Sequence, residues 1–248
     1  MKNYILEVCV DSVESALAAE KGGANRLELC SGLVIGGLTP SPSLFSAVRK
    51  ACNIKIHVLI RPRFGDFCYS DGEFANILDD VKLFRDLGAD GVVIGCLLPD
   101  GNLDIPRMKI LREAARKMSV TLHRAFDMCK DGILAINQCK ELGINTILTS
   151  GQKENCLAGV ENLKSYVKEA NSQIDILAGG GISADVIQEI QPKTQLSCFH
   201  MSGKITEQSK MLYKNPEVFM GLEGLSEFEI WKTDASKVAK AKEALENL

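Results

Sequence analysis

The chain alternates between short apolar or β-branched runs and longer stretches with helical periodicity, and this alternation constrains its fold more than any other feature. The strand-like runs start about 21 to 35 residues apart, which matches the length of a βαβ unit. Strands joined by crossover helices of this length form a parallel sheet. The predicted strands are Ile5–Val10, Arg26–Cys30, Ile56–Ile60, Gly91–Cys96, Val120–Phe126, Thr146–Ser150, Ile174–Ala178 and Cys198–Ser202.

The helical stretches fill the intervals between these runs and follow the last one. They are Ser12–Lys21, Pro42–Ala51, Glu73–Leu87, Pro106–Lys117, Ile133–Leu142, Cys156–Ala170, Ala184–Ile190 and Ala235–Leu248. Eight such units close naturally as a (β/α)8 TIM barrel, which typically needs roughly 250 residues. An open doubly wound sheet is the alternative. The sequence therefore predicts an α/β fold with a single TIM-barrel domain over residues 1–248.

Residues at the predicted helix starts support these boundaries. Asp11 with Glu14, and Ser70 with Glu73, have the spacing of capping boxes. Ser41-Pro42 offers an N-cap followed by proline at the first helical position. Each of these patterns predicts a helix N-terminus.

The segment 203–234 interrupts the alternation. It contains about 30 residues between the eighth strand and the eighth helix, and it carries Tyr213, Phe219, Phe228 and Trp231. A structureless loop of this length in a compact domain usually serves as a lid, an interface or a functional loop. We expect a long loop here.

Composition excludes several classes of protein. Lys plus Arg is 29 and Asp plus Glu is 32, so the net charge is −3, and we expect no nucleic-acid partner. No apolar run approaches the roughly 18 residues of a membrane span, and no signal-peptide core is visible, so we expect a cytoplasmic protein without a membrane partner. None of the nine cysteines forms a CxxC motif, which favours free thiols. The absence of Walker and GxGxxG motifs predicts no organic cofactor.

Two glutamates and two cysteines share the inner faces of the first two strands. Glu7 and Cys9 are two residues apart, as are Glu28 and Cys30, so each pair points to the same side of its strand. Their apolar neighbours suit the helix-facing side. Two converging thiolates suit a soft cation such as Cu(I). Free cysteines are also commonly small buried hydrophobes, and this interpretation stays open.

Charged residues also follow the third and fifth strands. Arg61, Arg63 and Asp66 come after the third strand, and His123 and Asp127 come after the fifth. These charged residues lie where the strands end, at the mouth of the predicted barrel. They can form a network of ion pairs that fills the barrel. They can equally form an acid/base site, because neighbouring charges shift pKa values.

Glycines and a serine follow the last two strands. In TIM barrels the loops after these strands often bind phosphate through backbone N–H groups. Gly180, Gly181 and Ser202 stand at these positions. They predict an anion site, although tight turns also use such glycines.

Several motifs resemble the CutC family of copper homeostasis proteins over nearly the whole chain, from Ile5 to about Ser202. They are Glu7–Glu14, Gly23–Cys30, Gly36–Ser41, Ile60–Arg63, Gly65–Phe67, Tyr69–Asp71, His123–Asp127 and Leu148–Gly151. The resemblance implies a cytoplasmic (β/α)8 barrel, often a homo-oligomer, that binds Cu(I) through Cys9 and Cys30. Phe64 stands where the family usually has glycine, and we expect it to narrow the mouth.

Two functions follow from these residues. The first is a cytosolic copper homeostasis protein that binds Cu(I) through the inward cysteines. The second is a TIM-barrel enzyme that acts on a small phosphorylated or anionic substrate. In the enzyme, Glu7, Glu28 and His123 are the acid/base candidates. Its anion-binding candidates are Arg61, Arg63, Asp66, Asp127, Gly180, Gly181 and Ser202. A scaffold that binds another protein is a third class, which no motif favours.

Overall fold

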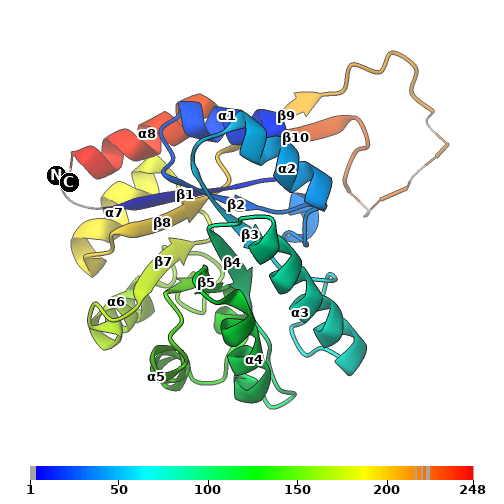
Figure 1. The fold of residues 1–248 in the computed structure, drawn as a ribbon. Coiled ribbons are helices and arrows are strands. Elements are labelled where there is room, and N and C mark those ends of the chain that lie inside the picture. The colour runs from blue at the N-terminus through cyan, green and yellow to red at the C-terminus, as the bar shows by residue number, and fades with distance from the viewer. Residues whose placement is uncertain (1–3, 216, 219, 222–223, 248) are drawn as a thin grey trace.

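The structure is a computed structural model that describes residues 4–215, 217–218, 220–221 and 224–247. Eight parallel strands form a closed barrel in which each strand pairs with its neighbours in chain order, and β1 pairs with β8. The helices surround the ring of strands (Figure 1). The predicted TIM barrel is therefore confirmed, and the open-sheet alternative is wrong.

All the predicted strands and helices are present; Ile5–Val10 and Pro42–Ala51 have the predicted ends, and the others are shifted at one or both ends. The barrel strands are β1 (Ile5–Val10), β2 (Arg26–Leu29), β3 (Lys55–Leu59), β4 (Gly91–Ile94), β5 (Ser119–Leu122), β6 (Thr146–Thr149), β7 (Asp175–Gly179) and β8 (Cys198–Met201). The helices are α1 (Val13–Lys21), α2 (Pro42–Ala51), α3 (Asp71–Asp86), α4 (Ile105–Ala115), α5 (Gly132–Leu142), α6 (Val160–Ala170), α7 (Ala184–Thr194) and α8 (Ala235–Glu246). Two short 3₁₀ segments, η1 (Leu33–Ile35) and η2 (Arg124–Met128), follow β2 and β5.

The largest boundary errors lie where local hydrogen bonds compete with the expected element. The predicted strand Val120–Phe126 ends at Leu122, because the His123 side chain accepts from Ala125 N and starts η2. Helix α7 continues past Pro192 to Thr194, whose Oγ1 donates to Ile190 O at 2.8 Å.

The helix caps are partly as predicted. Ser70 and Glu73 form the reciprocal capping box at the start of α3. The Ser41 side chain caps α2, with Pro42 in its first turn. At α1 the expected box from Asp11 is wrong, because Ser12 is the N-cap and accepts from Ser15 N at 3.2 Å.

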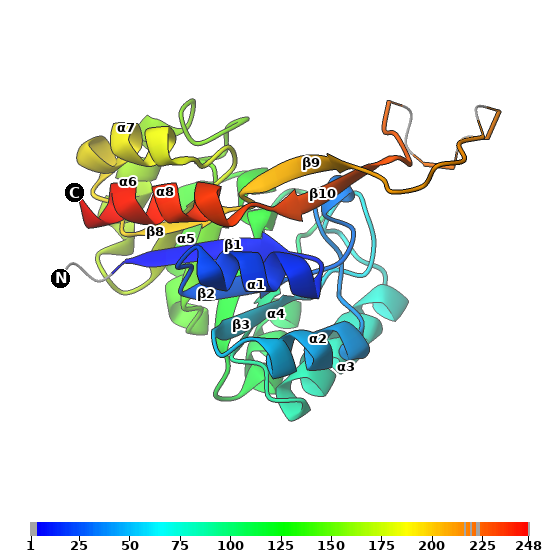
Figure 2. The ribbon, with the colours of Figure 1, turned by 90° about the horizontal axis from the view of Figure 1, so that it is seen from above.

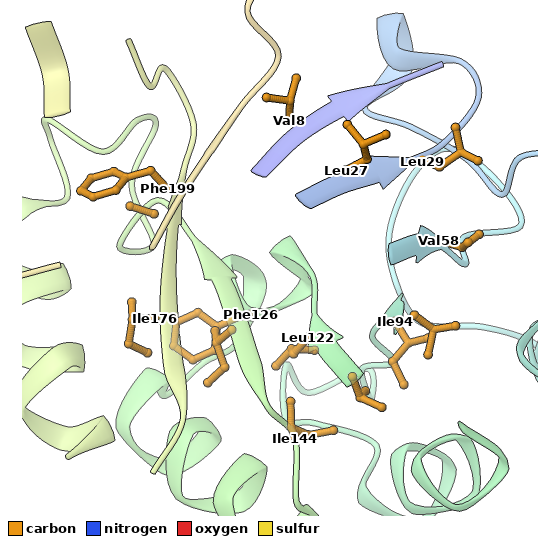
Figure 3. Packing of buried hydrophobic residues seen from close by; sticks show 14 of the residues in the cluster. Val8, Leu27, Leu29, Val58, Ile94, Leu122, Phe126, Ile144, Ile176 and Phe199 are labelled. Atoms are coloured by element: carbon orange, nitrogen blue, oxygen red, sulfur yellow. The ribbon is translucent and has the colours of Figure 1, made fainter. Parts of the chain in front are cut away.

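The main apolar core lies between the barrel and the helices. Figure 3 shows Val8, Leu27, Val58, Ile94 and Phe199 on the outer side of their strands, packed within this layer. The alternating residues face the barrel interior, where the described part of the chain forms two small apolar clusters. One contains Cys30, Leu59 and Val93, and the other contains Leu148, Leu177 and Cys198. The rest of the interior is therefore available to polar groups.

The segment after β8 is a β-ribbon in place of the expected loop. Strands β9 (Lys204–Gln208) and β10 (Glu229–Thr233) pair antiparallel and leave the barrel at the end where β1 terminates (Figure 2). Thr233 N donates to Ser15 Oγ at 3.2 Å, and Thr233 Oγ1 donates to Ser202 O at 3.2 Å. These bonds fix the root of the ribbon against α1 and β8.

Helix length and hydropathy also bear on membrane insertion. Among the residues that the structure describes, no helix combines the length and the apolar character needed to cross a bilayer.

The α3 capping box can be tested by substituting its serine. We expect Ser70→Ala to lower the free energy of unfolding by about 1 kcal/mol, because the Glu73 N–H loses its acceptor at the helix start. Urea denaturation measures the change. Ser236→Ala is the control, since the Ser236 backbone N–H is what binds Asp234, and its effect should stay below about 0.5 kcal/mol. Equal effects in both variants would contradict the assignment.

Candidate metal and anion site at the barrel mouth

A cavity of about 520 Å³ opens at the carboxyl ends of the strands. Its walls combine inward residues of the barrel, including Cys9, Glu28, Arg61, His123 and His200, with residues of the loops after β5, β7 and β8. The ribbon adds four further wall residues, which are Lys204, Trp231, Lys232 and Thr233. Active sites of TIM barrels lie at this end, so the position agrees with a functional cavity.

Glu7 is the centre of a buried ion network below the cavity. It is fully buried, and its carboxylate pairs with the Arg26 guanidinium on one side and with His200 Nδ1, at 2.7 Å, on the other. Strand register explains this, because Glu7 is the direct neighbour of Arg26 on β2 and of His200 on β8. Burial alone would raise the pKa of Glu7, but the Arg26 charge and the His200 hydrogen bond lower it to about 2. Glu7 is therefore a fixed anion.

Three potential metal ligands converge directly above Glu7. Cys9 Sγ, a Glu28 carboxylate oxygen and a His200 ring nitrogen all lie within 4.8 Å of one another. His200 Nε2 is 3.8 Å from Glu28 Oε2, and its Nδ1 is held by Glu7. Cys9 and Glu28 are register neighbours on β1 and β2, which places their side chains at one height. This arrangement can hold a cation through sulfur, nitrogen and oxygen.

The protonation of this cluster follows from its charges. Burial raises the pKa of Glu28 to about 7, with the positive His200 acting in the opposite direction. Burial disfavours the charged form of His200, but its contacts with Cys9, Glu28 and Glu7 raise its pKa well above the usual value. His200 is thus an imidazolium held between carboxylates.

Cys30 lies inside the barrel, as expected, but outside this group of three. Its thiol donates to Val10 O at 3.5 Å, and its side chain packs against Leu59 and Val93. Burial, together with the negative groups at Cys9, Glu28 and Asp11, raises the pKa of Cys30 well above the usual value. The structure therefore describes a protonated thiol in an apolar setting next to the cluster.

His123 presents an unpaired donor at the opposite wall. Its Nδ1 accepts from Ala125 N at 3.1 Å, so the ring proton lies on Nε2. The ring lies 4.7 Å from the Phe67 ring, and Nε2 has no partner among the described residues. Burial and the nearby Arg61 charge lower the pKa of His123 to about 3. His123 is a neutral hydrogen-bond donor.

The loop after β3 uses most of its charged groups internally. Arg61 borders the cavity, but its guanidinium donates to the carbonyls of Ile35, Gly37 and Gly65 at 2.8–3.3 Å. Arg63 pairs with Asp66 at 3.0 Å and with Glu73 at 2.5 Å. Neither Arg63 nor Asp66 borders the described cavity, so the structure does not bring these two predicted anion ligands to the site.

Phe64 also stays outside the cavity. Its side chain is 63% exposed and is absent from the described wall of the mouth. The expected narrowing of the mouth by Phe64 is wrong, because the loop directs this ring to solvent.

Asp127 borders the cavity, yet its oxygens organise the loop after β6. They accept from Thr149 Oγ1 at 2.5 Å, from Ser150 N at 3.1 Å and from Gln152 N at 3.1 Å, and they pair with Arg124 at 2.6 Å. These contacts position the loop next to the glycine turn after β7.

The predicted anion site retains its backbone donors. Gly180 and Gly181 line the cavity with φ of +115° and +80°. Within the described ranges, the N–H groups of Gly180, Gly181 and Ile182 find no intrachain acceptor. Ser202 borders the same cavity, as does Lys204, which sequence reasoning missed because it lies in the ribbon.

His200 is the second residue that sequence reasoning missed as a ligand. The sequence did carry a signal for it. His200 is two residues from both Cys198 and Ser202, so the three side chains share the inward face of one strand. Only the ring closure that pairs β8 with β1 brings it to Glu7 and Cys9.

Comparisons with known proteins agree with the fold and with the motifs. The CutC family model matches residues 4–205. A family protein CutC of Bacteroides fragilis strain YCH46 is 44% identical over 249 residues, which cover 100% of this chain and 98% of that protein. Another from Bacteroides thetaiotaomicron is also 44% identical, with 100% of both chains covered.

Solved structures show the same barrel. A crystal structure of CutC from Streptococcus agalactiae, a candidate copper homeostasis protein, superposes with a TM-score of 0.77 and 29% identity, over 80% of this chain and 98% of that chain. Thiamine phosphate pyrophosphorylase from Pyrococcus furiosus gives a TM-score of 0.57 at 17% identity, over 99% of this chain and 96% of that one. The second likeness concerns the fold alone.

The neutral state of His123 predicts a pH dependence of stability. Its pKa is about 3 in the folded protein and near 6.5 when exposed, so the unfolded chain binds a proton that the folded chain does not. The contribution of the neutral His123 to the free energy of unfolding is therefore complete above pH 6.5, and it is lost as the pH falls towards 3. Between pH 6 and 4, His123→Gln should remove about 1.4 kcal/mol per pH unit from the slope of the unfolding free energy.

Urea denaturation at a series of pH values measures that slope. Phe67→Leu is the matched control, because it disturbs the packing on the same ring and keeps the titrating group. It should lower stability and keep the wild-type slope. An unchanged slope in His123→Gln would show that His123 is protonated in the fold.

Proposed function

The chain belongs to the CutC family, and we propose that it serves copper homeostasis by binding Cu(I) at the barrel mouth through Cys9 and Cys30, with His200 as a nitrogen ligand. The observation that carries this proposal is the convergence of Cys9, His200 and Glu28 within 4.8 Å at the floor of the cavity. All nine cysteines are free thiols, which suits a reducing cytoplasm.

The donor set fits Cu(I). Thiolate sulfur is the ligand that Cu(I) prefers, and imidazole nitrogen is also suitable. Cys9 and Cys30 extend from adjacent strands, but Cys9 is in register with Glu28, so Cys30 lies one inward position further along β2. We propose that its thiol turns from Val10 O towards Cys9 when the ion binds. The Glu28 carboxylate is a harder ligand, and it lies 3.8 Å from His200 Nε2, beside the proposed ion.

Glu7 orients the nitrogen ligand. Its carboxylate accepts the Nδ1 proton of His200, which leaves Nε2 directed at Cys9 and Glu28. Metal binding requires Nε2 without its proton and sulfur as thiolate, so loading with Cu(I) releases protons. A carboxylate behind a ligating histidine typically contributes 10–100-fold, as an order of magnitude, to metal affinity.

An anaerobic Cu(I) competition titration tests these ligands. We expect the wild type to bind about one Cu(I), and each of Cys9→Ser, Cys30→Ser and His200→Gln to weaken binding by more than about tenfold. Cys68→Ser is the control, because Cys68 lies in the loop after β3, outside the cavity wall. Affinity unchanged in Cys9→Ser would refute the site, and an effect confined to Cys9 and His200 would remove Cys30 from it.

A second candidate function is an enzyme that acts on a small phosphorylated or anionic substrate. The backbone N–H groups at Gly180 and Gly181 line the same cavity as Glu28 and His123, and this observation favours it. There Glu28 exchanges a proton, since its pKa is about 7, and the neutral His123 donates a hydrogen bond. Glu7 is committed to Arg26 and His200, so it positions other groups.

Thermal unfolding in inorganic phosphate tests the anion site. We expect phosphate to raise the Tm of the wild type, because binding to the folded state stabilises it. Lys204→Gln should reduce this shift, since Lys204 borders the cavity beside the ribbon. Lys193→Gln, on the outer face of α7, should retain it. A wild type that shows no phosphate-dependent shift would contradict the anion-binding function.

A further inference from the structure

Arg61 is a buried cation to which the chain supplies no carboxylate. Its side chain borders the mouth cavity, and its terminal nitrogens donate to backbone carbonyl groups of the surrounding loops. Among the described residues it forms no ion pair, and its Nε has no hydrogen-bond partner. Arg26 is similarly buried, but it pairs with Glu7. Because buried charges are normally paired, the position of Arg61 indicates that a ligand supplies the anion.

His123 adds a second unused donor next to Arg61. Both side chains pack on Phe67, since the Arg61 guanidinium carbon is 5.2 Å from the centre of that ring and the His123 ring centre is 4.7 Å from it. The Nε2 proton of the neutral His123 has no acceptor among the described residues. A guanidinium beside a neutral N–H donor suits a carboxylate.

A further set of donors lies in the turn after β7. The N–H groups of Gly180 and Gly181 border the same cavity and have no acceptor within the described ranges. The Arg124 guanidinium lies beside them, because its Nη1 is 3.7 Å from the position that a Cβ on Gly180 would take. Arg124 Nε and Nη2 bind Asp127 and Ser150, so Nη1 stays available. Free amide groups next to a guanidinium suit a phosphate.

The two donor sets lie on one side of the mouth. They follow β3, β5 and β7, and Arg124 joins them, because it comes directly after His123 in the chain. The acidic wall residues Asp11 and Glu28 belong to the side formed by β1 and β2. A ligand with two anionic groups therefore binds away from these carboxylates.

We propose that the cavity binds a small phosphorylated carboxylic acid with one anionic group at each donor set. The phosphate contacts Arg124 and the amides of Gly180 and Gly181. The carboxylate contacts Arg61 Nε and His123 Nε2. Both of these nitrogens are covered in this structure, so the two side chains turn slightly towards the cavity when the ligand binds. This inference rests on the second candidate function, the enzyme that acts on an anionic substrate, and it specifies the chemical class of that substrate.

Two three-carbon phosphate esters that differ at one group test the carboxylate contact. The compound 3-phosphoglycerate carries a carboxylate where glycerol 3-phosphate carries a hydroxymethyl group. We expect the wild type to bind 3-phosphoglycerate at least about tenfold more tightly, because its carboxylate gains charge-assisted hydrogen bonds. Calorimetry measures both dissociation constants. Trp231 is the single tryptophan of the chain and borders the cavity, so its fluorescence reports whether each ester enters.

Two variants separate the ends of the ligand. His123→Phe removes the N–H donor and keeps a ring against Phe67. It should lose most of the preference for 3-phosphoglycerate and keep the affinity for glycerol 3-phosphate, which also shows that it is folded. Arg124→Met should weaken both esters alike, by at least about tenfold. Arg112→Met is the control, since Arg112 donates to Gly143 O outside the cavity wall, and it should retain the wild-type constants.

The wild-type comparison decides the proposal without any variant. Equal affinity for the two esters would overturn it and leave the anion-binding function standing. Failure to bind both esters and inorganic phosphate would overturn the inference and the anion-binding function together. A preference that survives in His123→Phe would overturn the contact between the carboxylate and His123.

Discussion

The buried pairing of Glu7 with Arg26 and His200 is the interaction on which the mouth of this barrel depends. Glu7 is fully buried, and a carboxylate in that position is stable only with charged or hydrogen-bonding partners. β1 receives both partners from its two neighbours in the ring, Arg26 from β2 and His200 from β8. The Glu7 carboxylate therefore has both of its partners only when the barrel is closed, because an open sheet would leave it without His200.

The strand alternation made much of the interior predictable. Inward positions for Glu7, Cys9 and Glu28 follow from the period of two along each strand and from their apolar neighbours. Partners across the ring were harder to predict, because residues of β8 and β1 become neighbours only when the sheet closes. His200 was missed for this reason, although the alternation along its own strand predicts that its side chain faces inward.

The loops were less predictable, because a sequence does not show which hydrogen bonds a charged side chain makes. Arg63 and Asp66 have the residue types of an anion site, but they bind each other and Glu73. Asp127 likewise uses its oxygens on amide and hydroxyl groups of the next loop. The ribbon in segment 203–234 was also not predicted, because its short exposed strands lack the apolar alternation of a buried sheet.

The outer apolar layer leaves the barrel interior free for chemistry, and Cys30 shows the consequence. Contacts between strands and helices stabilise the fold, so the interior can hold charges next to a small apolar cluster. Cys30 lies in that cluster, where burial and nearby negative groups oppose its ionisation. Such a thiol reacts poorly as a nucleophile, because the thiolate is the reactive form. A thiophilic cation offsets the cost of ionisation through the bond it forms, and the proposed role of Cys30 as a Cu(I) ligand depends on that bond.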